Sequence, residues 1–119
     1  MRSVVDRKYR LVENLIPGMS FPILEDVQNT QTWADITNEA QAGQPTGWVY
    51  DFDAYMKRPL FELFDLDSDP TQQTNLANSS DHAGVLARLK KELDRWREET
   101  DDPWLPCTSG TSTEQYCGH

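Results

Sequence analysis

The sequence predicts an α+β fold with two strand-like segments and one long C-terminal amphipathic helix. Three segments carry this prediction: two with strand-like patterning, residues 3–15 and 59–66, and one with helical patterning, residues 82–99. With 119 residues, the chain is long enough for one domain. We expect that domain to span residues 1–104, followed by a tail over residues 105–119.

The two predicted strands, 3–15 and 59–66, show the alternation expected where successive side chains point to opposite faces of a sheet. In the first segment, for example, Tyr9 and Leu11 share a face and charged residues lie between them. A proline–glycine pair at 17–18 is typical of a turn and ends this segment. Both segments are therefore predicted to be strands.

The predicted helix over 82–99 has apolar residues at helical spacing, so that they form one stripe. The stripe consists of Val85, Leu86, Leu89, Leu93 and Trp96. Asp81 is expected to cap this helix, because its carboxylate can accept hydrogen bonds from the first turn. A shorter helix is expected over 33–39, with Thr30 or Thr32 as its cap.

The charge of the chain excludes two classes of partner. It carries 20 Asp and Glu against 11 Lys and Arg, which gives a formal net charge of −9. Nucleic acid and anionic lipid both attract clusters of Lys and Arg, so we expect no nucleic acid and no membrane as partners. No stretch of about 18 consecutive apolar residues occurs, so no membrane-spanning helix is predicted.

The aspartates at 65, 67 and 69 have the spacing that begins a calcium-binding EF-hand loop. Such a loop needs Gly at its sixth position and Glu at its twelfth, and these positions hold Pro70 and Leu76. A turn at the end of a strand is therefore the prediction. His82 and His119 lack Cys or His partners at zinc-ligand spacing. We expect no catalytic residue, metal ligand or cofactor in this chain.

An aromatic patch lies in the middle of the chain, where the sequence does not settle the secondary structure. Its members are Trp48, Tyr50, Phe52 and Tyr55. Two interpretations stay open: the rings pack against another domain, or they stack on sugar rings. With Trp33 and Phe61 they outnumber what one helical stripe can cover, so we expect several of these rings to be exposed when the chain stands alone.

Two features bear on the cellular compartment. Cys107 and Cys117 are the only cysteines; they form either a disulfide in an oxidising compartment or two reduced thiols in the cytosol. Asn78 begins the only Asn-x-Ser/Thr sequon, Asn78-Ser79-Ser80, and is the candidate glycosylation site. Together they favour a protein of the secretory pathway.

A series of short motifs resembles the C-terminal domain of sulfatases. The family pattern is a strand ending Glu-Leu-x-Asp, an Asp-Pro turn, Asn-Leu-Ala and an amphipathic helix. The chain follows this order with Glu62-Leu63-Phe64-Asp65, Asp69-Pro70, Asn75-Leu76-Ala77 and the helix over 82–99. The run Ala42-Gly43-Gln44-Pro45-Thr46-Gly47-Trp48 is most similar to the sulfamidase group, which hydrolyses the N-sulfate of glucosamine in heparan sulfate. An iduronate- or aryl-type sulfatase is an alternative that this run disfavours.

The resemblance implies a small antiparallel sheet with the long C-terminal amphipathic helix over 82–99 packed on it. It also implies that the catalytic residues lie elsewhere. The formylglycine nucleophile of sulfatases arises from Cys or Ser in a Cys/Ser-x-Pro-x-Arg motif. The best match here, Ser20-Phe21-Pro22-Ile23-Leu24, has Leu in place of Arg. Formylglycine and Ca²⁺ are therefore expected in an N-terminal catalytic domain, and this chain is expected to be an inactive, supporting C-terminal fragment in which Met1 is an internal methionine.

The same resemblance implies partners and a location. The implied partners are the N-terminal catalytic domain, a second copy in a homodimer, and heparan sulfate as substrate of the parent enzyme. The implied location is the lysosome or the secretory pathway, where Cys107 and Cys117 would close a disulfide loop. The alternative is a non-catalytic module, derived from a sulfatase tail, that binds carbohydrate or protein.

Overall fold

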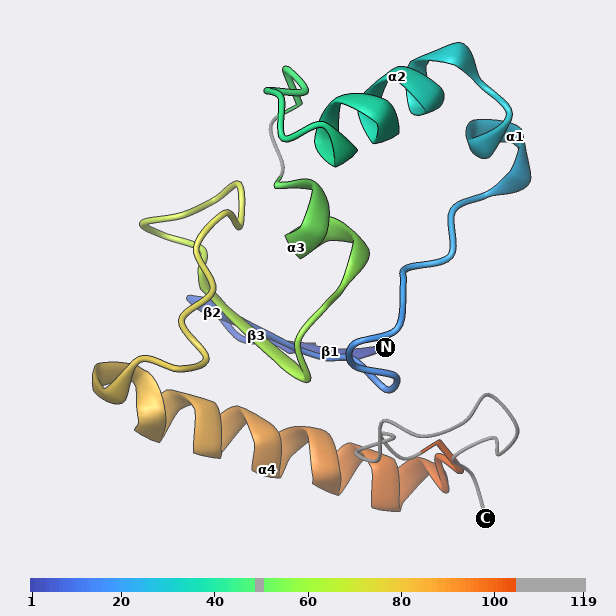
Figure 1. Cartoon of the computed structure of the whole chain (residues 1–119). Coiled ribbons are helices and arrows are strands. Elements are labelled where there is room, and N and C mark those ends of the chain that lie inside the picture. Colours follow the sequence, from blue (N-terminus) through green and yellow to red (C-terminus); the bar gives the residue numbers. More distant parts are fainter. Residues whose placement is uncertain (49–50, 105–119) are drawn as a thin grey trace. The chain divides into compact units, whose positions relative to one another are not determined.

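The computed structural model describes residues 1–48 and 51–104 (Figure 1). It confirms the predicted fold class, because it contains a three-stranded antiparallel sheet and a long C-terminal helix. The chain divides into two compact units. Unit 1 comprises Met1–Gly18 and the chain from Pro59 onward, and unit 2 comprises Met19–Arg58. Within the described residues, no helix is both long and apolar enough to cross a membrane.

The sheet of unit 1 has three strands in the order β1-β2-β3, with both neighbouring pairs antiparallel. These strands are β1 (Arg2–Val5), β2 (Tyr9–Glu13) and β3 (Phe61–Asp65). The register pairs Leu11 with Val4 on one side and with Leu63 on the other. Directly paired residues share a face, so these three side chains lie on the same side of the sheet.

Residues 3–15 form a hairpin, and the prediction of a single strand there is wrong. The side chain of Asp6 makes the turn, because its Oδ1 accepts hydrogen bonds from the N–H groups of Lys8 (2.8 Å) and Tyr9 (2.6 Å). Alternating side chains continue on both sides of this turn. The alternation alone therefore could not locate it.

Helix α4 (Ala83–Thr100) lies along one face of the sheet and completes the core of unit 1 (Figure 1). Leu11, Leu63 and Leu89 form that core, and at most 1% of each is exposed. This confirms the helix predicted over 82–99. At the conservative end of the range, burying one such side chain contributes about 1.5 kcal/mol.

Two details of the predicted helix differ in the structure. Trp96, assigned to the apolar stripe, is 45% exposed, whereas Arg97 is buried. Arg97 faces the sheet because it pairs with a carboxylate there. Asp81 does not cap α4: it lies within a 3₁₀ turn over Ser80–His82, so His82 precedes the helix and makes no capping bond through its side chain.

Unit 2 consists of three short helices joined by turns. They are α1 (Glu25–Gln28), α2 (Gln31–Gln41) and α3 (Phe52–Met56). The predicted cap of α2 is confirmed, because the Thr30 hydroxyl accepts a hydrogen bond from the N–H of Trp33 at 3.1 Å. Among the residues of unit 2 that the structure describes, none is fully buried.

Candidate functional site

The first candidate site is an aromatic cluster in unit 2. Its members are Phe21, Trp33, Trp48, Phe52 and Tyr55. Helix α2 contributes Trp33, helix α3 contributes Phe52 and Tyr55, and loops supply the other two rings. The ring centroids of Trp48 and Tyr55 are 4.7 Å apart, and those of Trp33 and Trp48 are 6.3 Å apart, both edge to face. Such pairs contribute about 0.5–1.5 kcal/mol each beyond the area that they bury.

The structure brings together three of the four predicted aromatics, namely Trp48, Phe52 and Tyr55. Tyr50 lies outside the described residues. Contrary to the expectation of exposed rings, Trp33 and the three assembled rings are each half-buried. They cover one another through ring contacts, edge to face or tilted, and this mutual packing is why they are half-buried although unit 2 is small. Phe21, which was not among the predicted rings, also belongs to this cluster.

Phe61, predicted together with these rings, is placed differently. It belongs to β3 and packs against the leucine core of unit 1. The Nζ atom of Lys90 lies 4.6 Å from its ring centroid, which is a cation–π contact. Phe61 therefore supports the sheet and is no member of the aromatic cluster.

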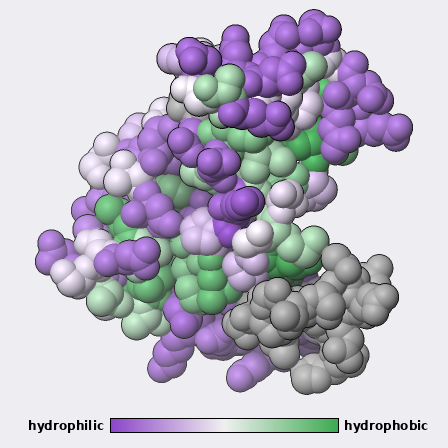
Figure 2. All heavy atoms as spheres, viewed as in Figure 1, coloured by the Kyte–Doolittle hydropathy of each residue, from purple (hydrophilic) through white to green (hydrophobic). Residues whose placement is uncertain are grey.

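A groove beside the aromatic cluster is lined almost entirely by apolar side chains. They include Ile23, Leu24, Val27, Trp33, Ile36 and Tyr55. Leu24 is 76% exposed and Val27 is 43% exposed. Hydrophobic side chains also reach the surface in the space-filling view (Figure 2). The groove lining contains no charged residue, so it suits an apolar partner better than a sulfated sugar.

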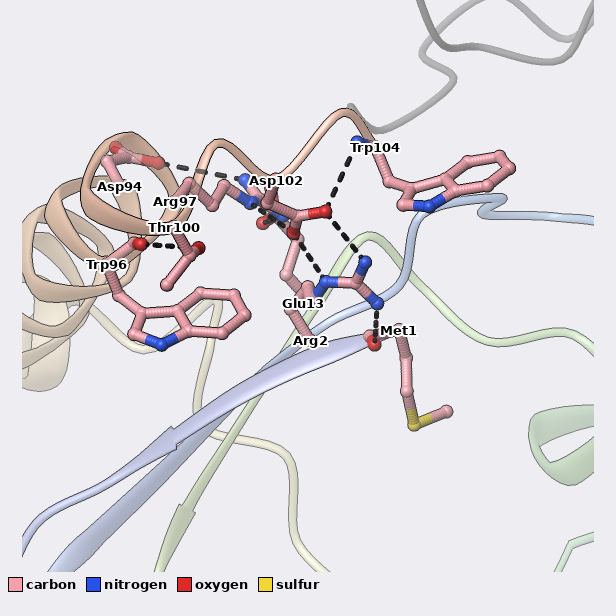
Figure 3. A network of polar contacts seen from close by, with 9 residues as sticks. All are labelled: Met1, Arg2, Glu13, Asp94, Trp96, Arg97, Thr100, Asp102 and Trp104. Atoms are coloured by element: carbon pink, nitrogen blue, oxygen red, sulfur yellow. Dashed lines mark hydrogen bonds and ion pairs between the residues drawn. The ribbon is translucent and has the colours of Figure 1, made fainter.

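The second candidate site is an ion-pair network in unit 1 that joins the sheet to the end of α4 (Figure 3). Arg97 on α4 pairs with Glu13 on β2 at 2.5 Å, and less than 10% of either side chain is exposed. Arg2 on β1 donates two hydrogen bonds to the carboxylate of Asp102, at 2.6 and 2.8 Å. This bidentate geometry is among the stronger arrangements for an arginine and a carboxylate.

Two carboxylates of unit 1 that accept arginine hydrogen bonds, those of Asp6 and Asp102, have lowered pKa values. The hydrogen bond from Arg2 lowers the pKa of Asp102 to about 2. The pKa of Asp6 is also lowered to about 2, first by the N–H of Tyr9 and then by Arg88. Both groups stay ionised at neutral and mildly acidic pH, so neither is suited to transfer a proton there. Their arrangement fits a structural role.

The aspartates near the end of β3 form the predicted turn. Asp65 accepts from the N–H groups of Asp67 and Ser68, and Asp69 accepts from those of Gln73 and Thr74. Among the described residues, no group of three His, Cys, Asp or Glu side chains is placed to hold a metal ion. These carboxylates therefore stabilise the turn by accepting hydrogen bonds from its backbone N–H groups.

Two predicted features remain, the glycosylation site and the cysteine pair. Asn78 is exposed, in a turn between β3 and α4. Cys107 and Cys117 lie outside the described residues, so their pairing stays a prediction.

Comparison with known proteins yields sulfatases, although no protein-family model matches the chain. The chain is 42% identical over 97% of its length to N-sulphoglucosamine sulphohydrolase from Homo sapiens. It is 33% and 26% identical, over 89% and 85% of its length, to two ulvan-active sulfatases from Formosa agariphila. It spans only 23% of the human protein and 18% of each of the other two. The resemblance to sulfatases predicted from the motifs is thereby confirmed.

Proposed function

Taking the chain as a relative of sulfatases, we propose that it forms the C-terminal part of a sulfamidase-type enzyme. The parent enzyme would hydrolyse the N-sulfate of glucosamine residues in heparan sulfate. The observation that carries the proposal is the 42% identity to the human sulphohydrolase over 97% of the chain, which spans only 23% of that protein. Such a match fits one section of a larger enzyme.

In this proposal the chain supplies support and the chemistry is located elsewhere. The sequence contains no Cys/Ser-x-Pro-x-Arg motif from which formylglycine could arise. The described residues do not fit a Ca²⁺ site either, because Asp65 and Asp69 are engaged by backbone N–H groups of their own turn. We therefore assign no reaction step to this chain. Isolated, it is expected to show only background turnover of N-sulfoglucosamine.

The two units would support the enzyme in different ways. Unit 1 has a buried leucine core and an ion pair that fixes α4 on the sheet, so it can act as a rigid body. Unit 2 presents an uncharged groove with Leu24 and Val27 exposed at its rim. A catalytic domain of the same enzyme is the partner that we propose for this groove.

The proposed location is the lysosome or the secretory pathway. In that environment Cys107 and Cys117 are expected to form a disulfide. Mass spectrometry of the secreted chain before and after reduction tests this directly. Two free thiols in secreted protein would contradict both the disulfide and the location.

The proposed function is best tested with a chimera. The matching section of human N-sulphoglucosamine sulphohydrolase is replaced by this chain, and hydrolysis of N-sulfoglucosamine is measured. We expect activity in the chimera and none in the isolated chain. A chimera that is secreted and folded yet inactive would contradict the proposal, as would activity of the isolated chain.

A pair of variants in the chimera tests the contact surface. Val27→Asp places a charge at the apolar groove and is expected to reduce secretion or activity strongly. Val5→Asp is the matched control, because Val5 is also exposed, at 56%, but lies outside the groove. Equal effects of the two changes would show that the groove has no special role.

The alternative function is a non-catalytic carbohydrate-binding module. The half-buried rings of the aromatic cluster pack on one another, which leaves less ring face for sugar stacking. Titrating the isolated chain with heparan sulfate while following tryptophan fluorescence distinguishes the two. Saturable binding that is lost in Trp48→Ala would favour the module.

A further inference from the structure

We infer that Asn78 is an acceptor for an N-linked glycan. The inference goes beyond the support of a catalytic domain, and it rests on the proposed passage through the secretory pathway, where such glycans are added. Its basis is the position of the sequon in the fold, in addition to its presence in the sequence. An N-linked glycan needs an accessible asparagine in a surface segment.

The sequon lies on an exposed turn that leads into α4. The turn is closed by a hydrogen bond of 3.0 Å from the N–H of Ser79 to the carbonyl oxygen of Leu76. Asn78 and Ser80, which are the two residues that define the acceptor, are both exposed. The residue between them is held inward, because the Ser79 hydroxyl lies 3.0 Å from Nδ1 of His82. The acceptor amide and the hydroxyl that its recognition requires are thus on the outside.

A second asparagine three residues earlier has the opposite role. Asn75 donates a hydrogen bond to the carbonyl of Phe61 at 3.1 Å and accepts from the N–H groups of Leu63 and Ala77, at 2.9 and 3.0 Å. Its amide is therefore used to fix the turn onto β3. Within the described part of the chain, the side chain of Asn78 makes no hydrogen bond of this kind. The side-chain amide of Asn75 is therefore engaged in hydrogen bonds within the fold, whereas that of Asn78 is available for modification.

The surface beside Asn78 has room for sugar residues. Asn78 lines a wide, open hollow along α4. Small side chains form part of this surface, namely Ala77, Ser80, Ala83 and Ala87. Lys91 and Arg95 also line it and offer hydrogen-bond donors to sugar hydroxyls. A glycan at Asn78 would therefore lie over an open surface and displace no part of the core.

The test is secretion of the full chain from a eukaryotic cell, behind a cleavable signal. The product is treated with peptide-N-glycosidase and compared with untreated protein on gels and by mass spectrometry. We expect a loss of mass on treatment and conversion of Asn78 to aspartate. The mass loss is expected to be absent in Asn78→Gln and Ser80→Ala and retained in Ser80→Thr, which keeps the hydroxyl.

The Asn75→Gln variant is the matched control. It should keep the glycan and lower the thermal midpoint, because it disturbs the bonds that hold the turn. If Asn78 of the secreted wild-type chain is unmodified, and the wild type has the same thermal midpoint as the Asn78→Gln variant, the inference is overturned. Sulfatase activity of the chimera is measured separately, so an active chimera with a bare Asn78 would refute the glycan and leave the proposed function standing.

Discussion

The two units of this chain reach stability by different routes. In unit 1, Leu11, Leu63 and Leu89 are almost completely removed from solvent. In the described part of unit 2, no residue is fully buried, and half-buried aromatic rings contact one another instead. Aliphatic burial gives unit 1 a core of its own. Unit 2 leaves apolar surface available, which is consistent with the proposed contact with a catalytic domain.

Their polar contacts differ in the same sense. In unit 1, Arg97 reaches Glu13, and Arg2 reaches Asp102, so residues from opposite ends of the chain are tied together. In unit 2, helix caps such as that from Thr30 join residues a few positions apart, and the long-range hydrogen bond from the N–H of Phe21 to the carbonyl oxygen of Met56 (2.6 Å) involves the backbone alone. Long-range pairs fix how elements pack, whereas local caps only fix where helices begin. Unit 1 is therefore expected to be the more resistant to unfolding.

The largest expected loss of stability comes from truncating a leucine side chain in the core of unit 1. Leu63→Ala should lower the free energy of unfolding by about 3–5 kcal/mol, because it leaves a cavity among fully buried neighbours. Ile36→Ala in unit 2 truncates a side chain that is only half-buried, so it should lower the free energy of unfolding by about 1 kcal/mol. Urea denaturation of the full chain, followed by circular dichroism, measures both. Similar losses would remove the distinction between the units.

The next effect comes from the buried ion pair. Arg97→Ala should cost about 3 kcal/mol, because Glu13 is then left buried without its partner. Arg95→Ala, two positions earlier on the same helix, is the control, and its exposed ion pairs are worth at most about 1 kcal/mol. A double change of Arg97→Met and Glu13→Leu should recover much of the loss. If the double change is no better than Arg97→Ala, the pair is not what limits stability.

A smaller effect is expected in the aromatic cluster. Trp33→Leu removes the ring contacts with Trp48 and Phe52 and should cost about 1–2 kcal/mol. Near-ultraviolet circular dichroism should lose intensity, while far-ultraviolet signal from α4 persists. Loss of both signals together would mean that unit 2 and unit 1 unfold as one.

The smallest expected effect is a loss of stability at acidic pH. The pKa of Asp102 is about 2, below its ordinary value of 3.8, so its contribution to stability is complete above about pH 4. That contribution falls as the pH drops from about 4 towards 2, and it is unchanged between neutral pH and pH 5. Urea midpoints across this range should therefore be more sensitive to acid in the wild type than in Asp102→Asn. Equal acid sensitivity would show that Asp102 is not responsible.

Much of the fold could be predicted from the sequence, because it depends on local patterns. The helical spacing that includes Leu89 and Leu93 predicted α4, and Thr30 predicted the start of α2. The turn at Asp6 was missed because the strands on both sides of it keep the same alternation. Asp6 is a single turn-forming residue among other charged residues, so the sequence there indicates a turn only weakly.

The inward side of α4 was harder to predict than the helix itself. Trp96 is the more apolar residue, yet Arg97 is the buried one. Its partner, Glu13, lies 84 positions away in the sequence, and only the pairing of β2 with the helix brings the charges together. Likewise, the rings of the aromatic cluster could be named in part, but their mutual packing depends on the folding of α2 and α3. Such long-range contacts leave no periodic signal.

Unit 1 carries its own core, whereas we propose that unit 2 depends on a covering surface. Hydrogen–deuterium exchange of the isolated full chain tests it most directly, since it reports protection segment by segment. We predict strong protection of β2, β3 and α4, and exchange of α2 that is faster by orders of magnitude. In the chimera, the amides of α2 should become protected. Equal protection of α2 and α4 in the isolated chain, unchanged in the chimera, would contradict the account.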